Sequence, residues 1–347
     1  MRRALIAVAA LAVIVVAMLV GVRSVGPGTR AAPEDRLYVA ISRNEDETDA
    51  REIEAIDLAS GERTLFDVGA RITALTLSSD RRTLFVAVDD GRVLLLDPND
   101  GVTFGEIRTR RALWLVAVPG RSEVVALSHD GATATVARLA VAGRREEASA
   151  TLPDAAPGRP AFRRDELLVP LWSRGANALA RFEGQALDRV QRAQVARLAG
   201  RLQLGVPQVQ VTPNGEAVYL AQWDSSPAAV RLLTGVAAEA PARETLLAVA
   251  GPAPDRPLRG LLQVQASLAS AGDGTLHVCV GNAATATRYV VGTAAQVVGS
   301  ECGQLTRAGE GMYLALRGKP RVAVIEATSG RILRELLLPG IPVLVAG

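Results

Sequence analysis

The feature that most constrains this chain is a repeat of short apolar segments with a period of about forty residues. From Leu37 onward these segments alternate with turns rich in Gly, Asp, Asn and Pro, and no long amphipathic helix intervenes. Three copies of the unit align, at 72–101, 209–235 and 309–336. Dividing residues 37–347 by seven gives about 44 residues per unit, the length of a four-stranded propeller blade. The sequence therefore predicts an all-β, seven-bladed β-propeller.

The blade boundaries leave one strand over. Blade one contains only three segments, 37–42, 52–58 and 63–69, and the later blades span 70–109, 112–153, 160–197, 206–249, 261–301 and 304–338. The chain then ends with one further apolar segment. We expect 341–346 to be the innermost strand of blade one, because this pairing joins both ends of the domain and leaves only short, protected edges.

The N-terminus predicts a membrane anchor. Residues 4–22 are 19 consecutive residues without charge, preceded by Arg2 and Arg3. As a helix they would span about 28 Å, close to the ~30 Å hydrocarbon core of a bilayer. We interpret 1–23 as a transmembrane signal-anchor and 24–36, which contains two prolines and two glycines, as a flexible linker. Cleavage of the segment as a secretory signal is the alternative.

The paired arginines followed at once by an apolar run are typical of an export signal. We therefore expect a single-pass protein of the cell membrane whose domain, 37–347, is extracytoplasmic. Lys plus Arg total 39 against 36 Asp plus Glu, and removing Arg2, Arg3 and Arg23 brings the net charge of +3 to zero. No basic footprint for nucleic acid remains.

Three stretches carry a family resemblance. Residues 84–101 (LFVAVDDGRVLLLDPNDG), 312–336 (MYLALRGKPRVAVIEATSGRILREL) and 339–347 (PGIPVLVAG) resemble the YVTN-type bacterial β-propeller repeat. Blades two, five and seven match that repeat well, and blade four matches it poorly. The resemblance implies a fold more than a function, because such propellers include lactone-hydrolysing enzymes, cofactor-bearing redox propellers and surface proteins.

Local motifs predict no catalytic residue, no metal site and no cofactor. The chain has two histidines and two cysteines, and it contains no nucleophile elbow, zinc helix, haem-attachment site or phosphate loop. We interpret His129 as a turn residue, and His277 as a strand residue packed between blades. The aspartates beside glycines in blade two are expected to form local turn hydrogen bonds rather than a calcium site; they are Asp89, Asp90, Asp97 and Asp100.

A binding face is predicted where the turns between second and third strands meet the connections between blades. Trp172 and Trp223 hold matching positions before the third strands of blades four and five, although packing between blades is an equal interpretation. The arginine-rich stretch 189–201 reads as a short helix or a basic loop, and the acidic turn 43–52 as a binding element or a solvated loop. The candidates for this face are Trp172, Trp223, Arg174, Asp224, His129, Arg192, Arg197, Glu45, Asp46 and Glu47.

These observations predict a protein-binding or scaffold module that contacts the membrane through 4–22 and another protein or a membrane complex through its domain. A lactonase-like hydrolase, or a redox propeller that binds its cofactor non-covalently, is the alternative. Cys279 and Cys302 are either a disulfide, which an extracytoplasmic setting permits, or two buried thiols.

Overall fold

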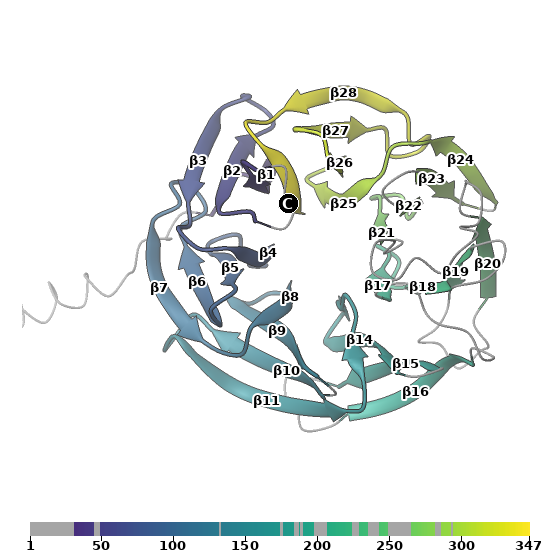
Figure 1. Ribbon diagram of the computed structural model, residues 1–347, viewed down its shortest axis with the longest axis horizontal. Coiled ribbons are helices and arrows are strands. Elements are labelled where there is room, and N and C mark those ends of the chain that lie inside the picture. The colour runs from purple at the N-terminus through teal and green to yellow at the C-terminus, as the bar shows by residue number, and fades with distance from the viewer. Residues whose placement is uncertain are drawn as a thin grey trace, which may run out of the picture.

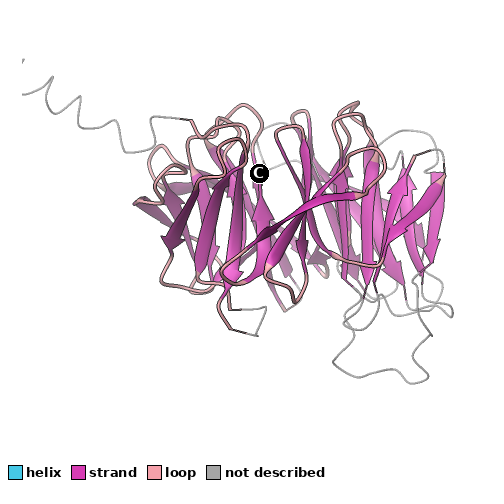
Figure 2. Ribbon diagram, turned by 90° about the horizontal axis from the view of Figure 1, so that it is seen from above, coloured by secondary structure: helices cyan, strands magenta, loops and turns pink. Residues whose placement is uncertain are grey.

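The computed structural model describes residues 31–44, 49–131, 133–173, 176–183, 187, 190–197, 207–223, 229–234, 243–248, 265–281, 286–292 and 294–347. Within these ranges every regular element is a β-strand. The strands are arranged as a ring of sheets (Figure 1) and run between its two faces, where the turns lie (Figure 2). The predicted β-propeller is confirmed.

The described strands form seven sheets, which we number in chain order. Sheet 1 comprises β29 (Ile341–Ala346), β1 (Arg36–Ser42), β2 (Glu52–Asp57) and β3 (Arg63–Asp67). Sheet 2 comprises β4 (Ile72–Leu77), β5 (Leu84–Val88), β6 (Arg92–Leu96) and β7 (Thr103–Arg108). Sheet 3 comprises β8 (Ala112–Ala117), β9 (Glu123–Asp130), β10 (Thr133–Ala140) and β11 (Arg145–Pro153). Sheet 4 comprises β12 (Ala156–Pro157), β13 (Ala161–Arg163), β14 (Glu166–Ser173), β15 (Ala176–Phe182) and β16 (Val190–Arg197).

Sheet 5 comprises β17 (Gln208–Val211), β18 (Ala217–Trp223), β19 (Ala229–Thr234) and β20 (Arg243–Ala248). Sheet 6 comprises β21 (Gln265–Ser270), β22 (Leu276–Gly281), β23 (Ala286–Val291) and β24 (Ala295–Gly299). Sheet 7 comprises β25 (Gly303–Ala308), β26 (Gly311–Leu316), β27 (Arg321–Ile325) and β28 (Ile332–Leu337). Neighbouring strands of each sheet are antiparallel, and β4, β8, β17, β21 and β25 lie nearest the middle of the ring (Figure 1).

Strand β29 joins the two ends of the domain. It pairs antiparallel with β1, from Tyr38 opposite Ala346 to Ser42 opposite Ile341. All seven residues of β1 are buried, because β29 and β2 cover the two edges of this strand and sheets 2 and 7 pack against its two faces. The last strand of the chain is therefore an inner strand of the first sheet.

The hydrophobic core lies between neighbouring sheets. Successive side chains of a strand point to opposite faces, so Phe85 and Ala87 pack towards sheet 3 while Val86 packs towards sheet 1. Every residue of β5 is buried as a result. This two-sided burial explains why the second and third strands read as continuous apolar runs rather than as alternating patterns.

Polar side chains also connect the inner strands of adjacent sheets. The bonds run from Thr73 Oγ1 to the Ala112 carbonyl (2.8 Å), from Leu268 N–H to Gln208 Oε1 (3.3 Å), from Leu305 N–H to Ser267 Oγ (2.8 Å) and from Val345 N–H to Gln304 Oε1 (3.0 Å). Each bond satisfies a backbone group that faces another sheet rather than a strand partner.

Part of the predicted linker is fixed against the propeller. The Ala32 N–H donates to the Arg81 carbonyl at 2.8 Å, and the Arg81 guanidinium donates to the carbonyls of Ala32, Pro33 and Glu34. Of the described residues, none belongs to a helix long and apolar enough to cross a membrane. The predicted anchor, 4–22, lies outside the described residues.

Cys279 and Cys302 form a disulfide, with their Cα atoms 5.4 Å apart. The bridge joins β22 to the connection between sheets 6 and 7. Cys279 is 1% exposed, and its Sγ accepts a hydrogen bond from the Gly303 N–H at 3.2 Å. The disulfide therefore fixes the place where the chain crosses from one sheet to the next.

Candidate functional site

The structure places three of the sequence candidates at one edge of their sheets. His129, Trp172 and Trp223 lie at or next to the last residue of β9, β14 and β18, the second strands of sheets 3, 4 and 5. They pair with Ala134, Asn177 and Ala229 respectively. His129 is half-buried. All three precede a turn between a second and a third strand.

The arginine-rich stretch differs from its sequence interpretation. Residues 190–197 form strand β16, the outer strand of sheet 4, so this part is neither a helix nor a loop. The stretch is extended because it pairs with β15, where Arg192 lies opposite Ala180 and Arg197 lies opposite Ala176. The remaining candidates lie outside the described residues; they are Glu45, Asp46, Glu47, Arg174 and Asp224.

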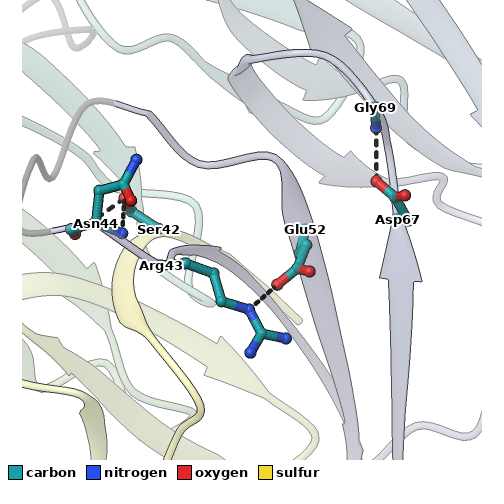
Figure 3. Close-up of polar contacts among 6 residues, drawn as sticks. All are labelled: Ser42, Arg43, Asn44, Glu52, Asp67 and Gly69. Carbon is teal, nitrogen blue, oxygen red and sulfur yellow. Dashed lines mark hydrogen bonds and ion pairs between the residues drawn. The ribbon is translucent and has the colours of Figure 1, made fainter.

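The described ends of the acidic turn 43–52 are paired with arginine (Figure 3). Arg43 Nε lies 2.6 Å from a carboxylate oxygen of Glu52, and Arg51 Nε lies 2.9 Å from Asp49 Oδ1. The Asn44 N–H donates to Ser42 Oγ at 3.3 Å at the start of the turn. These two acidic side chains are therefore balanced locally. In the neighbouring turn, the Gly69 N–H donates to Asp67 Oδ1 at 2.9 Å.

The interpretation of the aspartates in sheet 2 as turn residues is confirmed for three of them. Asp97 Oδ1 accepts the Asn99 N–H at 2.8 Å, Asp100 Oδ1 accepts the Val102 N–H at 2.9 Å, and Asp90 Oδ1 accepts the Arg92 N–H at 3.1 Å. Each bond runs two residues along the chain, as in an Asx-turn.

His277 is packed between sheets, as predicted. Its side chain is fully buried in β22, and its Nε2 lies 2.6 Å from the Ala327 carbonyl of sheet 7. Burial lowers the pKa of His277 below its ordinary value, with a smaller contribution in the same direction from Arg288. The histidine is therefore a neutral structural contact between two sheets.

A small cleft, partly open to solvent, lies between sheets 3 and 4. Its wall on sheet 3 includes the turn from β8 to β9, and its wall on sheet 4 includes the turn from β13 to β14. Leu187, which lies between β15 and β16, completes it. Turns from first to second and from third to fourth strands share one edge of an antiparallel sheet. The cleft is therefore at the edge opposite His129, Trp172 and Trp223.

The floor of the cleft is apolar. Val118, Val125, Leu167 and Leu187 are at least nine-tenths buried, and Phe162 packs partly exposed against the same group. These residues belong to the hydrophobic core between sheets 3 and 4. The cleft is thus a place where the core between two sheets comes close to the solvent.

The wall on sheet 3 is held in place by sheet 2. Pro119 and Gly120 occupy the central positions of the turn, and Gly120 has a φ of 69°, which favours glycine. The Gly120 N–H donates to Ser79 Oγ at 2.8 Å, and Ser122 Oγ donates to Asp80. Burial acts to raise the pKa of Asp80, but hydrogen bonds from Ser122 and Ser78 outweigh it and lower the pKa. An ionised Asp80 therefore anchors this turn.

Three arginines and one aspartate supply the charge of the lining: Arg121, Arg138, Arg164 and Asp165. Arg138 lies between two carboxylates, 3.5 Å from Glu123 and 3.1 Å from Glu147. Arg121 also lies 3.4 Å from Glu123 and is 37% exposed. Arg164 is exposed and forms no side-chain ion pair or hydrogen bond with the described residues.

Sequence reasoning missed this cleft. The available signals were the Pro119-Gly120 pair, which is typical of a sharp turn, and the charged run 163–166 between two apolar strands. Neither signal shows that the two turns face each other, because their relative position depends on how sheet 4 packs against sheet 3.

Comparison with solved structures shows the fold alone. The chain is similar to the periplasmic gluconolactonase PpgL of Pseudomonas aeruginosa, with a TM-score of 0.61 and 15% identity over 89% of this chain and 98% of that one. It is similar to hydrazine synthase of Kuenenia stuttgartiensis, with a TM-score of 0.60 and 12% identity over 80% of this chain and 90% of that one.

A third similar structure is the β-propeller domain of Cps50 (Swd1) of Myceliophteria thermophila, with a TM-score of 0.54 and 15% identity over 85% of this chain and 95% of that one. No protein-family model matches the sequence, and no curated protein matches it. The three similar structures belong to different proteins, so the comparison gives this chain an architecture without a shared function.

Proposed function

We propose that this chain is a membrane-anchored, extracytoplasmic propeller that binds another protein. The observation that carries the proposal is the cleft between sheets 3 and 4, where an apolar floor meets a rim of arginine side chains. An apolar centre with arginine at its border is typical of protein interfaces, and arginine is enriched among the residues that contribute most to binding. WD40-type propellers among the similar structures, such as RRP9, are in keeping with a binding role.

The test is purification of the full-length protein from its own membranes in a mild detergent, with quantitative identification of the proteins that accompany it. A matched control joins residues 1–36 to an unrelated soluble domain, so that it shares the anchor and lacks the propeller. We expect at least one polypeptide to be enriched in near-stoichiometric amount with the full chain and not with the control. Equal recovery of every polypeptide with both baits would refute the proposed function.

The proposed location is tested separately. If residues 37–347 are extracytoplasmic and 4–22 remain in the membrane, protease added to intact spheroplasts should digest the propeller and leave a membrane-bound fragment. Protection of the full chain until the spheroplasts are lysed would reverse the orientation.

A lactonase-like hydrolase is the alternative, in keeping with the similarity in fold to PpgL. The two proposals are separated by assaying the purified full-length protein with gluconolactone as the probe substrate. Turnover that Asp165→Asn abolishes would favour the hydrolase, because Asp165 supplies the carboxylate of the described cleft lining.

A further inference from the structure

We propose that the cleft between sheets 3 and 4 recognises an acidic, extended segment of the partner protein. In this arrangement a partner carboxylate lies against Arg164 and Arg121, and an adjacent apolar side chain of the partner lies on the floor formed by Val118, Phe162 and Leu187. The inference rests on the proposed function, because it specifies what the propeller binds and where.

The charge pattern selects the carboxylate. Arg138 is already neutralised by Glu123 and Glu147, so it acts as part of the wall. Arg121 has a single contact, a 3.4 Å pair with Glu123, and Arg164 has no side-chain partner among the described residues. An arginine guanidinium carries five N–H donors and matches a carboxylate in a paired geometry. The unused donors therefore lie at the rim of the cleft.

The floor selects an apolar neighbour for that carboxylate. Leu187 and Val118 are 6% and 7% exposed, and Phe162 is partly exposed beside them. A ligand that covers Phe162 removes the exposed apolar surface of this ring from water, which a free inorganic anion does not do. An amphipathic segment therefore fits the lining better than an isolated anion.

The backbone of Arg164 provides an independent argument. Its φ is 55°, in the left-handed region, where a side chain other than glycine is uncommon. The turn from Arg163 to Glu166 has only two central residues, and glycine would suit the first of them. An arginine at this position is costly for the fold, and its side chain gains no hydrogen bond or ion pair from the described residues in return.

Substitution of Asp165 is expected to change the affinity in the direction opposite to substitution of Arg164. Its carboxylate lines the cleft beside Arg164 and repels an incoming carboxylate. Replacing Asp165 by asparagine should therefore strengthen the binding of an acidic segment, whereas damage to the fold would weaken it.

The experiment uses the full-length protein in detergent and an immobilised array of hexapeptides. Each hexapeptide begins with Gly-Ser and ends with Ser-Gly, and its two central positions are varied so that the array contains every pair of residues. The strongest acidic-apolar peptide and its amide counterpart, with Gln for Glu or Asn for Asp, are then made with a fluorescein label. Their dissociation constants are measured by fluorescence anisotropy for the wild type and for three variants.

The variants are R164G, D165N and the control R144G. Arg144 also has a positive φ, 49°, in a turn between two strands, but it does not line the cleft. Because glycine suits both positions, R164G and R144G should keep the fold, which melting curves verify.

We expect the acidic peptide to bind about tenfold more tightly than its amide counterpart, a difference of ~1.4 kcal/mol. R164G should lose about tenfold in affinity, R144G should match the wild type, and D165N should gain about threefold. Equal binding of the acidic and amide peptides, unchanged binding by R164G, equal losses in R164G and R144G, or no acidic-apolar peptide bound on the array would each overturn the inference.

This result is separable from that of the proposed function. A partner that accompanies the full chain from membranes and is retained by R164G would leave the binding function standing and remove the cleft as its site. Failure to enrich any partner would refute the function whatever the peptides do.

Discussion

The disulfide between Cys279 and Cys302 makes a quantitative prediction about stability. The two residues are 23 positions apart, so the bridge closes a loop of moderate length in the unfolded chain. In the chain-entropy model, closing such a loop stabilises the folded state by about 3.4 kcal/mol. Reduction of the bridge should therefore lower the free energy of unfolding by about that amount, without changing the sheets that it connects.

A second perturbation separates the cross-link from the packing of its sulfur atoms. Cys279 is buried among Leu305, Met312 and their neighbours, and its Sγ accepts the Gly303 N–H. The double variant C279A/C302A loses the cross-link, part of this packing and that hydrogen bond. We expect it to be less stable than the reduced wild type by a further ~1 kcal/mol.

The assay is urea unfolding followed by far-ultraviolet circular dichroism, with and without a membrane-permeant reductant, on the wild type and the double variant. The reductant should shift the wild type and leave the double variant unchanged. A reduced wild type that unfolds at the same urea concentration as the oxidised protein would refute the loop-entropy argument. Thiol labelling of denatured, unreduced protein should find no reactive thiol, and two per chain would also contradict the proposed extracytoplasmic location.

Three further changes test the fold. Truncation after Gly340 removes β29 from the edge of β1 and should cost at least about 4 kcal/mol, and a melting temperature within two degrees or so of the full chain would contradict this. Burial lowers the pKa of His277 from its ordinary 6.5, so the unfolded chain binds a proton at this residue before the folded chain does as the pH falls. The urea concentration at the midpoint of unfolding should therefore decrease when the pH is lowered below about 6.5, and it should decrease less in His277→Gln. Gly303→Ala places a Cβ 1.6 Å from the Ala315 carbonyl oxygen and should cost about 3 kcal/mol or more by urea unfolding, whereas Gly61→Ala, with no atom near its Cβ, should cost less.

The architecture could be predicted because its determinants are local and repeated. A strand buried on both faces, such as β5, reads as an unbroken apolar run, and each turn carries its own Gly, Asn or Asp signal. The place of β29 followed from counting, because the first unit lacked one strand and the chain ended with an extra one. The stretch 190–197 was harder, since its arginines gave no strand pattern and pairing with β15 determined its structure.

The cleft could not be predicted because it is a property of two sheets. Trp172 and Trp223, which are rare residues in this sequence, lie before the turns that follow second strands. The cleft lies at the other edge, where common residues from the turns of sheets 3 and 4 come together. Its position depends on how Ser79 and Asp80 of sheet 2 hold the turn at Pro119, and those contacts join residues about forty positions apart.

Three arginines with positive φ differ in whether their side chains offset the cost of this backbone conformation, and only Arg164 lines the cleft. In the described part of the chain, the non-glycine residues with positive φ are Arg81, Arg144, Asp154 and Arg164. Aspartate tolerates this conformation better than most residues. Arg81 binds the carbonyls of 32–34, and Arg144 lies against Gly105, where a Cβ would be 2.8 Å from its Nε. Both side chains thus gain contacts that offset the backbone cost. Arg164 has the same conformation, but its side chain forms no hydrogen bond or ion pair with the described residues, and the carboxylate of the proposed acidic segment would supply one.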